Sequence, residues 1–112
     1  MKTEVKLESN STVVNVKGHV DALTAPELSK VLLGQITAGH ANLVVNLIGV
    51  EFMSSAGLRT LLGAVKEARS HGGDLRIASP NPGTDKVLKM SGFHNIARVF
   101  ASQDEAVSSF GS

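Results

Sequence analysis

Cysteine, tryptophan and tyrosine are absent from the sequence, and its 112 residues include only four phenylalanines. Without cysteine, the chain cannot form a disulfide, a zinc–thiolate site or a thiol nucleophile. The absence fits a reducing compartment, and we expect a cytoplasmic location. Aromatic side chains, on which single-stranded nucleic acids stack, are scarce. Because eleven basic residues balance ten acidic ones without a block of like charge, we expect no direct binding of nucleic acid.

Long apolar runs are also missing. No run approaches the roughly 20 residues of a membrane-spanning helix, so we expect no membrane contact. The first residues, MKTEVKLES, alternate charged and apolar side chains, unlike a signal peptide. Hydrophobic residues make up 42% of the chain and charged residues 19%, which is typical of a compact fold. With 112 residues and no long linker, we expect a single domain over 1–112.

The sequence does contain a regular alternation of strand-like and helix-like segments. Short apolar runs bounded by turn residues predict strands at 5–8, 12–20, 42–47, 74–79 and 97–100, with a turn at 80–83. Helical spacing of apolar residues predicts helices at 22–36, 56–70, 84–92 and 102–110. The run 42–47 is apolar enough for burial on both faces. This order predicts an α/β fold with a mostly parallel or mixed sheet and covering helices.

Two of the predicted helices carry clear apolar stripes. Pro26 falls near the first turn of the helix at 22–36, where its missing N–H is harmless. The stripe of this helix consists of Leu28, Val31, Leu32 and Ile36. The stripe of the next helix consists of Leu58, Leu61, Leu62, Val65 and Ala68, and the glycines of HGG (71–73) end that helix.

The stretch VEFMSSAGLRTLL, residues 50–62, places two adjacent serines before the second helix. In open α/β sheets, ligands gather at the carboxyl ends of strands, so we expect Met53, Ser54 and Ser55 in a loop there and at the helix start. A helix N-terminus favours an anion, which makes a phosphoryl group on serine well placed. Arg59, one helical turn beyond Ser55, is spaced to approach such a group. From these residues alone, a serine is more commonly a helix N-cap.

Three segments together resemble the bacterial anti-sigma factor antagonists of the STAS domain family: VKGHVDALTAPEL, NLVVNLIGVEFMSSAGLRTLL and ARSHGGDLRIASPNPGTDKVLKMSGFHNIARVF. The resemblance implies a single STAS domain over 1–112, with a mixed sheet of four to five strands and about four helices. It implies a regulatory protein that is not an enzyme and uses no cofactor. Members of this family bind an anti-sigma factor that is also a serine/threonine kinase. Phosphorylation of one serine separates the two proteins, and a serine phosphatase resets the switch.

The family's functional residues can be carried over to matching positions. By resemblance, Ser55 matches the phosphorylated serine, and Ala56 and Gly57 match the positions after it. Asp21, in GHVDA, matches an acidic residue that lies near the acceptor in the family. The aspartate that usually precedes the acceptor is Ser54 here, and we interpret Ser54 as a helix cap.

The remaining candidates are weaker. Asn46 stands where many family members have aspartate, so we expect less negative charge near the acceptor. Met53 is typical of a core or rim position. The alternative for Met53 and Phe93 is partial exposure at an interface, where methionine and aromatic residues are enriched. Considered alone, Asp21 is typical of a turn or cap, and Arg59 of a solvated helix charge. The predicted partner-binding residues are Asp21, Met53, Ser54, Ser55, Gly57, Arg59 and Phe93.

Two other functional classes stay open. A serine hydrolase would use Ser54 or Ser55 as its nucleophile, but the G-x-S-x-G turn is missing and we expect no acid to orient His71 or His94. The four histidines have no metal-ligand spacing, so we expect no metal. The second class is a STAS module outside sigma control: a secretion or signalling switch, a nucleotide-sensing module or the soluble subunit of a lipid transporter. The sequence leaves dimerisation open.

Overall fold

Five strands form one sheet in which each strand lies beside the next one along the chain. The computed structural model describes residues 1–111. Its strands are β1 (Lys2–Leu7), β2 (Thr12–Val20), β3 (Asn42–Met53), β4 (Asp74–Ala78) and β5 (Val99–Phe100), in the order β1-β2-β3-β4-β5. β1 runs antiparallel to β2, and the other neighbouring pairs are parallel. The predicted α/β fold with a mixed sheet is confirmed.

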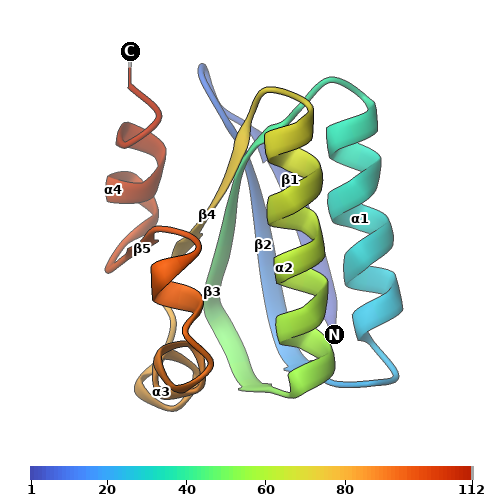
Figure 1. The fold of residues 1–112 in the computed structure, drawn as a ribbon, viewed down its shortest axis with the longest axis vertical. Helices are drawn as coiled ribbons and strands as arrows, with labels where there is room; N and C mark the ends of the chain where they lie inside the picture. The colour runs from blue at the N-terminus through green and yellow to red at the C-terminus, as the bar shows by residue number, and fades with distance from the viewer. Residues whose placement is uncertain (112) are drawn as a thin grey trace.

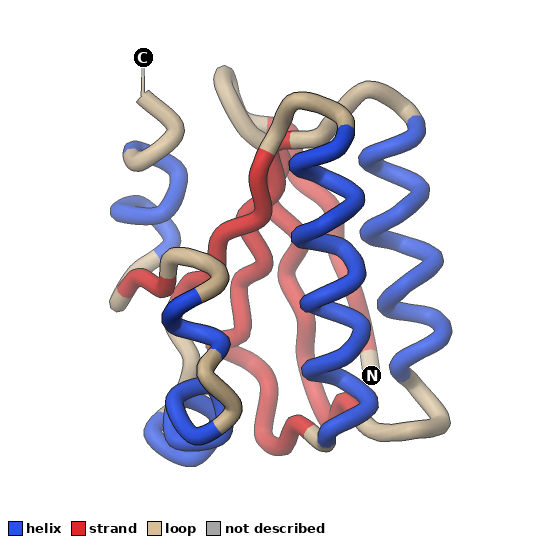
Figure 2. Tube along the Cα trace, in the orientation of Figure 1, coloured by secondary structure: helices blue, strands red, loops and turns tan. Residues whose placement is uncertain are grey.

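Helices cover both faces of this sheet. They are α1 (Ala25–Thr37), α2 (Ser55–Ser70), α3 (Pro82–Met90), the short 3₁₀ helix η1 (Phe93–Asn95) and α4 (Gln103–Ser108). Figure 1 shows α1 and α2 side by side on one face and α4 on the other. Figure 2 shows that loops cluster at the two ends of the sheet, where strands turn into helices. Within residues 1–111, every helix is too short or too polar to cross a bilayer.

Most buried apolar side chains pack between the sheet and the layer formed by α1 and α2. Alternate residues of β3 point to this side, namely Leu43, Val45 and Leu47. Each fully buried leucine contributes about 1.5–3 kcal/mol of hydrophobic stabilisation. Val44 points the other way, into a smaller cluster beneath α4. The prediction that 42–47 is buried on both faces is therefore confirmed from residue 43 onward.

The predicted stripes of α1 and α2 are the buried faces of these helices. In α1 the buried members are Leu28, Leu32 and Ile36, and Val31 is half-buried. In α2 they are Leu58, Leu61, Val65 and Ala68, with Leu62 half-buried. α2 ends as predicted, because Gly72 adopts φ 83° and the N–H of Gly73 bonds back to Ala68 O at 2.8 Å.

Several element boundaries differ from the sequence prediction: β1 spans Lys2–Leu7 rather than 5–8, α1 begins at Ala25 rather than at 22, and β5 spans Val99–Phe100 rather than 97–100. The differences in β3 and α3 have identifiable causes. β3 continues to Met53 rather than ending at 47, because residues 49–53 pair with residues 17–20 of β2. α3 begins at Pro82, so residues 80–83 are not a separate turn. The Asn81 Oδ1 accepts a hydrogen bond from Thr84 N–H at 2.7 Å, and Pro82 occupies the first helical turn. Asparagine followed by proline is thus a helix start here.

Candidate functional site

The carboxyl ends of β2 and β3 meet the first turn of α2. Val20 pairs with Met53 at the end of the two strands, and the N–H of Ser54 donates to Val20 O at 2.8 Å. Figure 1 shows this junction at the lower end of the sheet, where β3 passes directly into α2. Ser54 and Ser55 therefore lie at the carboxyl edge, as predicted, although Met53 belongs to the strand and not to a loop.

The two adjacent serines have different structural roles. Ser54 has extended backbone angles, and its Oγ accepts a hydrogen bond from Gly57 N–H at 3.5 Å. Its carbonyl accepts from Leu58 N–H at 3.1 Å, which closes the first turn. Ser55 is the first helical residue, and its side chain is exposed. Ser54 is thus the N-cap, as interpreted from the sequence, and the Ser55 hydroxyl is open to solvent beside the helix N-terminus.

Gly57 lets α2 start close to the sheet. A Cβ atom at this position would lie 2.8 Å from Val20 Cγ1 and 2.9 Å from Met53 Cγ. Both distances are far below van der Waals contact, so a side chain would push the first turn away from β2 and β3. Gly57 faces the interior of its own domain and contributes to a binding surface only by setting the position of Ser54 and Ser55.

Two of the predicted partner-binding residues, Met53 and Phe93, are buried. Met53 is 3% exposed and Phe93 is 1% exposed, and both belong to the core beneath α1 and α2. For Met53, burial agrees with the core interpretation and excludes the interface alternative, because successive side chains of a strand point to opposite faces. Phe93 begins the short helix η1 and belongs to the same core, so the interface alternative is wrong for it as well. Met53 points inward, whereas its neighbour Phe52 is 52% exposed. Leu23, in the loop before α1, is 90% exposed. Sequence analysis missed both of these apolar side chains, although their position at a strand end and in a turn could have suggested exposure.

Asp21 organises the loop between β2 and α1. Its Oδ1 accepts hydrogen bonds from the N–H groups of Leu23 at 2.9 Å and Thr24 at 3.1 Å. The backbone bonds from Thr24 and Leu23 lower the pKa of the Asp21 carboxyl below its usual 3.8. Asp21 follows Val20, whose carbonyl holds Ser54, so a fixed negative charge lies in the loop next to the serines. Its role as a turn residue is confirmed.

A groove between α1 and α2 begins at the same end of the molecule. It is an open groove with a volume of about 660 Å³. Its lining consists of small and amphipathic residues, including Ala22, Pro26, Leu33, Ala56, Arg59 and Gly63. Arg59 is exposed, and its guanidinium has no ion pair within residues 1–111. The solvated charge expected at this position is confirmed, and it lies one helical turn from Ser55.

Asn46 does not belong to this site. Its side chain lies on the α4 side of the sheet, where its Nδ2 donates to Gln103 Oε1 at 2.9 Å and to Asn15 Oδ1 at 3.0 Å. Its Oδ1 accepts from Ile48 N–H at 3.1 Å. The expectation that Asn46 changes the charge near Ser55 was therefore wrong, because α4 and α2 cover opposite faces of the sheet.

The histidines do not assemble a reaction centre with either serine. Contrary to expectation, His94 has an acidic partner, since its Nε2 lies 2.8 Å from Asp85 Oδ1. That pair connects η1 with α3 and has no hydrogen bond to Ser54 or Ser55. Within residues 1–111, no three side chains with metal-binding groups gather at one place.

Comparison with known proteins gives consistent results over the whole chain. A family model described as the STAS domain matches residues 2–106. BtrV of Bordetella bronchiseptica, which is assigned to the anti-sigma factor antagonists, is 29% identical over 110 residues, or 98% of this chain and 95% of its own. The anti-sigma-B factor antagonist of Bacillus subtilis is 27% identical over 107 residues, or 96% of this chain and 97% of its own.

Solved structures share the fold. The anti-sigma factor antagonist SpoIIAA of Bacillus, in its unphosphorylated form, superposes with a TM-score of 0.82 at 21% identity, over 96% of this chain and 94% of that chain. The phosphorylated form of that protein superposes with a TM-score of 0.75. At these identities the likeness establishes a common architecture.

Proposed function

The chain belongs to the STAS domain family, and on this premise we propose that it is an anti-sigma factor antagonist controlled by phosphorylation of Ser55. In its unphosphorylated form it binds an anti-sigma factor that is also a serine/threonine kinase. Phosphorylation of Ser55 by that kinase ends the complex, and a serine phosphatase restores the binding form. The named relatives are antagonists, a regulatory class rather than an enzymatic one, which agrees with the prediction that the protein is not an enzyme.

One observation carries this proposal: at the start of α2, one serine caps the helix and the other has an exposed hydroxyl. Ser54 supplies the cap, so the hydroxyl of Ser55 is not needed to hold the helix. Ser55 is exposed in the first turn, where an approaching kinase can reach it. A phosphoryl group added there carries about −1.5 to −2 charge, which the positive end of the helix tolerates.

The surroundings of Ser55 explain how one charge can end a complex. Leu23 and Phe52 are exposed apolar side chains on the loop and strand that flank the serines. We take these two residues, together with Ser55, Arg59 and the groove between α1 and α2, as the switch surface. A partner that covers this surface must remove water from the phosphate, and burying an unpaired charge costs several kcal/mol. Phosphorylation therefore weakens binding without a change of fold.

The test is intact mass and site mapping after incubation with the cognate kinase and ATP. We expect one phosphoryl group on wild type, on Ser55, and none on Ser55→Ala. Ser54→Ala is the matched control, because it removes a neighbouring hydroxyl and should still be labelled. In titration calorimetry, Ser55→Ala should bind the kinase and stay bound when ATP is added, whereas Ser55→Glu should bind more weakly. A phosphoryl group found on Ser54 instead of Ser55 would show that the proposal names the wrong serine.

A second experiment separates sigma control from other STAS roles. Affinity capture from the native cell extract should recover a kinase with an ATPase fold, and capture should fail with Leu23→Asp. Recovery of transporter subunits in place of the kinase would contradict the proposal.

A further inference from the structure

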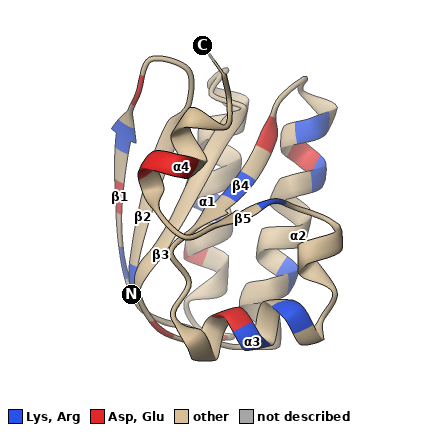
Figure 3. Cartoon of the chain, turned by 90° about the vertical axis from the view of Figure 1, so that its left-hand side faces the viewer, with Lys and Arg blue, Asp and Glu red and all other residues tan. Residues whose placement is uncertain are grey.

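The free edge of β1 carries a charge pattern that is complementary to itself. β1 pairs with β2 on one side, and no strand among residues 1–111 lies on its other side. Lys2, Glu4, Lys6 and Glu8 alternate in sign along it, and Figure 3 shows them as blue and red bands on the outermost strand and its turn. We propose that this edge pairs in antiparallel orientation with the β1 edge of a second copy of the chain, forming a homodimer with one continuous sheet.

The ladder between β1 and β2 determines which backbone groups are free for this contact. The N–H of Glu8 donates to Ser11 O at 2.8 Å, so these two residues form a hydrogen-bonded pair next to the turn. Hydrogen-bonded and non-bonded pairs alternate along an antiparallel ladder. The register runs without interruption from Lys2 to Leu7. The even-numbered residues of β1 therefore bond to β2, and the odd-numbered residues direct their N–H and C=O groups to the free edge.

A two-fold axis at Val5 brings these free groups together. Val5 then faces Val5 of the second copy, and Thr3 faces Leu7 of the second copy. Each facing pair exchanges two backbone hydrogen bonds. Every residue in these pairs belongs to the odd-numbered set, so the pairing uses the groups that β2 leaves free.

The same register places opposite charges opposite each other. Glu4 faces Lys6 of the second copy and Lys2 faces Glu8, and symmetry repeats each pair. The smallest shift that keeps free groups facing one another is two residues. A shift in one direction places Lys2 against Lys6 of the second copy and Glu4 against its symmetry mate. A shift in the other direction places Glu4 against Glu8 of the second copy and Lys6 against its symmetry mate. Opposite charges across strands stabilise and like charges destabilise, so the pattern selects one register.

The charges on this edge are available for a partner. Lysines on an edge strand often prevent pairing by repulsion. Here they alternate with glutamates, and none of the four side chains takes part in an ion pair within the described part of the chain. Lys2, Glu4 and Lys6 are exposed. A second copy with the same alternation therefore meets attraction at every charged position.

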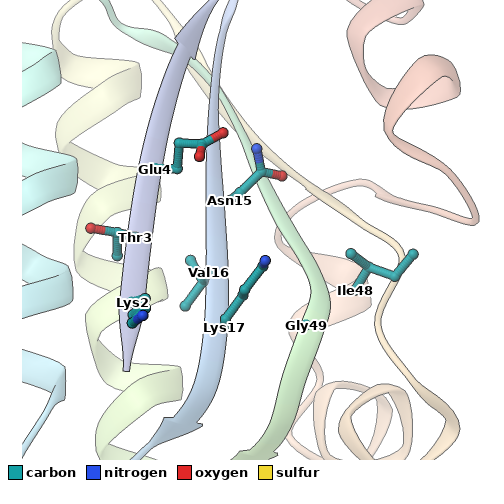
Figure 4. A pocket seen from close by; sticks show the side chains of 8 residues that line it. All are labelled: Lys2, Thr3, Glu4, Asn15, Val16, Lys17, Ile48 and Gly49. Atoms are coloured by element: carbon teal, nitrogen blue, oxygen red, sulfur yellow. The ribbon is translucent and has the colours of Figure 1, made fainter.

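The opposite side of the strand adds apolar surface. Figure 4 shows Thr3 pointing toward the helices and Glu4 pointing to the other side of the sheet. Val5 and Leu7 share the side of Thr3 and are 39% and 62% exposed. A groove of about 550 Å³ between β1 and α1, lined in part by Val31, leaves space on this side for the partner strand's side chains. Pairing would cover both apolar side chains and is independent of Ser55.

Sedimentation velocity on the full chain, over a concentration series at low salt, tests the dimer. Glu4→Lys and Lys6→Glu each make facing charges alike in their own homodimer, and we expect each variant to dimerise about tenfold more weakly or worse. Mixed in equal amounts, the two variants restore both opposite-charge pairs, so the mixture should dimerise like wild type. Glu67→Lys, at an exposed position on α2, changes the net charge by as much as Glu4→Lys and should leave dimerisation unchanged.

Two further measurements locate the contact. Val5→Pro removes one free-edge N–H and no bond to β2, so it should abolish the dimer while circular dichroism remains native. Amide exchange of Thr3, Val5 and Leu7 should slow as protein concentration rises, whereas Glu4 and Lys6 are protected at all concentrations. If the wild-type chain stays monomeric at a concentration of about 1 mM, its affinity for a second copy is too weak for a specific dimer, and the proposal is overturned. A dimer that neither charge reversal nor Val5→Pro weakens also overturns it.

Discussion

Different interactions hold the helices against the two faces of the sheet. Beneath α1 and α2 lies a large cluster of aliphatic side chains contributed by both helices and by β2, β3 and β4. Beneath α4 the buried apolar residues are few, namely Val13, Val44, Ala78 and Ala106. Apolar packing is spread over many small contacts, so the α1–α2 face has a broad, rigid support. The α4 face needs other interactions.

On the α4 face, hydrogen bonds and a cation–π contact add to the small apolar cluster. The guanidinium of Arg76 lies 4.0 Å from the centre of the Phe110 ring, and its Nη1 donates to Ser109 Oγ at 2.9 Å. Asn46 donates to Gln103 at the start of α4. The two faces should therefore respond differently to a change in one side chain. The charge that we propose at Ser55 would be added to a helix that the large core holds in place, whereas we expect substitution of one polar residue to loosen α4.

The largest effect should come from the apolar face. Leu61 is fully buried at the centre of α2. Leu61→Ala should lower the free energy of unfolding by about 2–5 kcal/mol, because it removes packed atoms and leaves a cavity. Urea denaturation measures this loss. The half-buried Leu62 is the control, and Leu62→Ala should cost less; equal losses would mean that α2 is not packed as described.

A substitution on the α4 face should have a smaller and more local effect. Arg76→Lys keeps the positive charge beside Asp74 but loses the planar group that stacks on Phe110 and bonds Ser109. We expect a loss of about 1–2 kcal/mol in the free energy of unfolding. Hydrogen exchange should accelerate for the amides of α4 and stay unchanged for those of α2. A uniform acceleration over the whole chain would show that the two faces are not independent.

The two serines should differ by a smaller amount. Ser54→Ala removes the cap of α2 and should cost about 1 kcal/mol. Ser55→Ala removes an exposed hydroxyl without a structural partner and should change stability by no more than about 0.5 kcal/mol. Thermal unfolding of both variants in parallel tests this order. A larger loss for Ser55→Ala would make that serine structural.

The smallest effect depends on pH. Because the N–H groups of Thr24 and Leu23 hold the pKa of Asp21 below its usual value, the folded chain releases this proton more readily than the unfolded chain. The contribution of Asp21 to stability is therefore complete above about pH 4 and is lost as the pH falls through the lower, folded value. Asp21→Asn should flatten the pH dependence of stability in that acidic range, as measured by urea denaturation. An unchanged slope would show that another carboxyl group is responsible.

The sequence predicted most of the fold because periodicity reports which side of an element is buried. The stripe around Leu61 and the continuous run at 43–47 are direct consequences of the core. The start of α3 was missed although Asn81 and Pro82 form a helix-start pattern, because proline and glycine nearby were interpreted as a turn. β3 was predicted too short because Gly49 and Glu51 interrupt its apolar run, whereas pairing with β2 carries the strand to Met53.

The candidate site was predicted in part. Ser54 as a cap follows from local chemistry, which the sequence contains. The exposure of Phe52 and the burial of Met53 depend on which face of β3 meets α2, and this requires the register of the assembled sheet. The bond between His94 and Asp85 joins residues of two elements whose relative position no local pattern reveals.

The order of the strands in the sheet has a consequence for synthesis of the chain. Since spatial neighbours are also successive strands, β1 and β2 can form their hairpin as soon as both have left the ribosome. β3, β4 and β5 then add one after another to the same growing edge, and no strand has to be inserted between two that are already paired. Translation and sheet assembly thus run in the same direction, so a chain still attached to the ribosome has only one edge to which a later strand must be added.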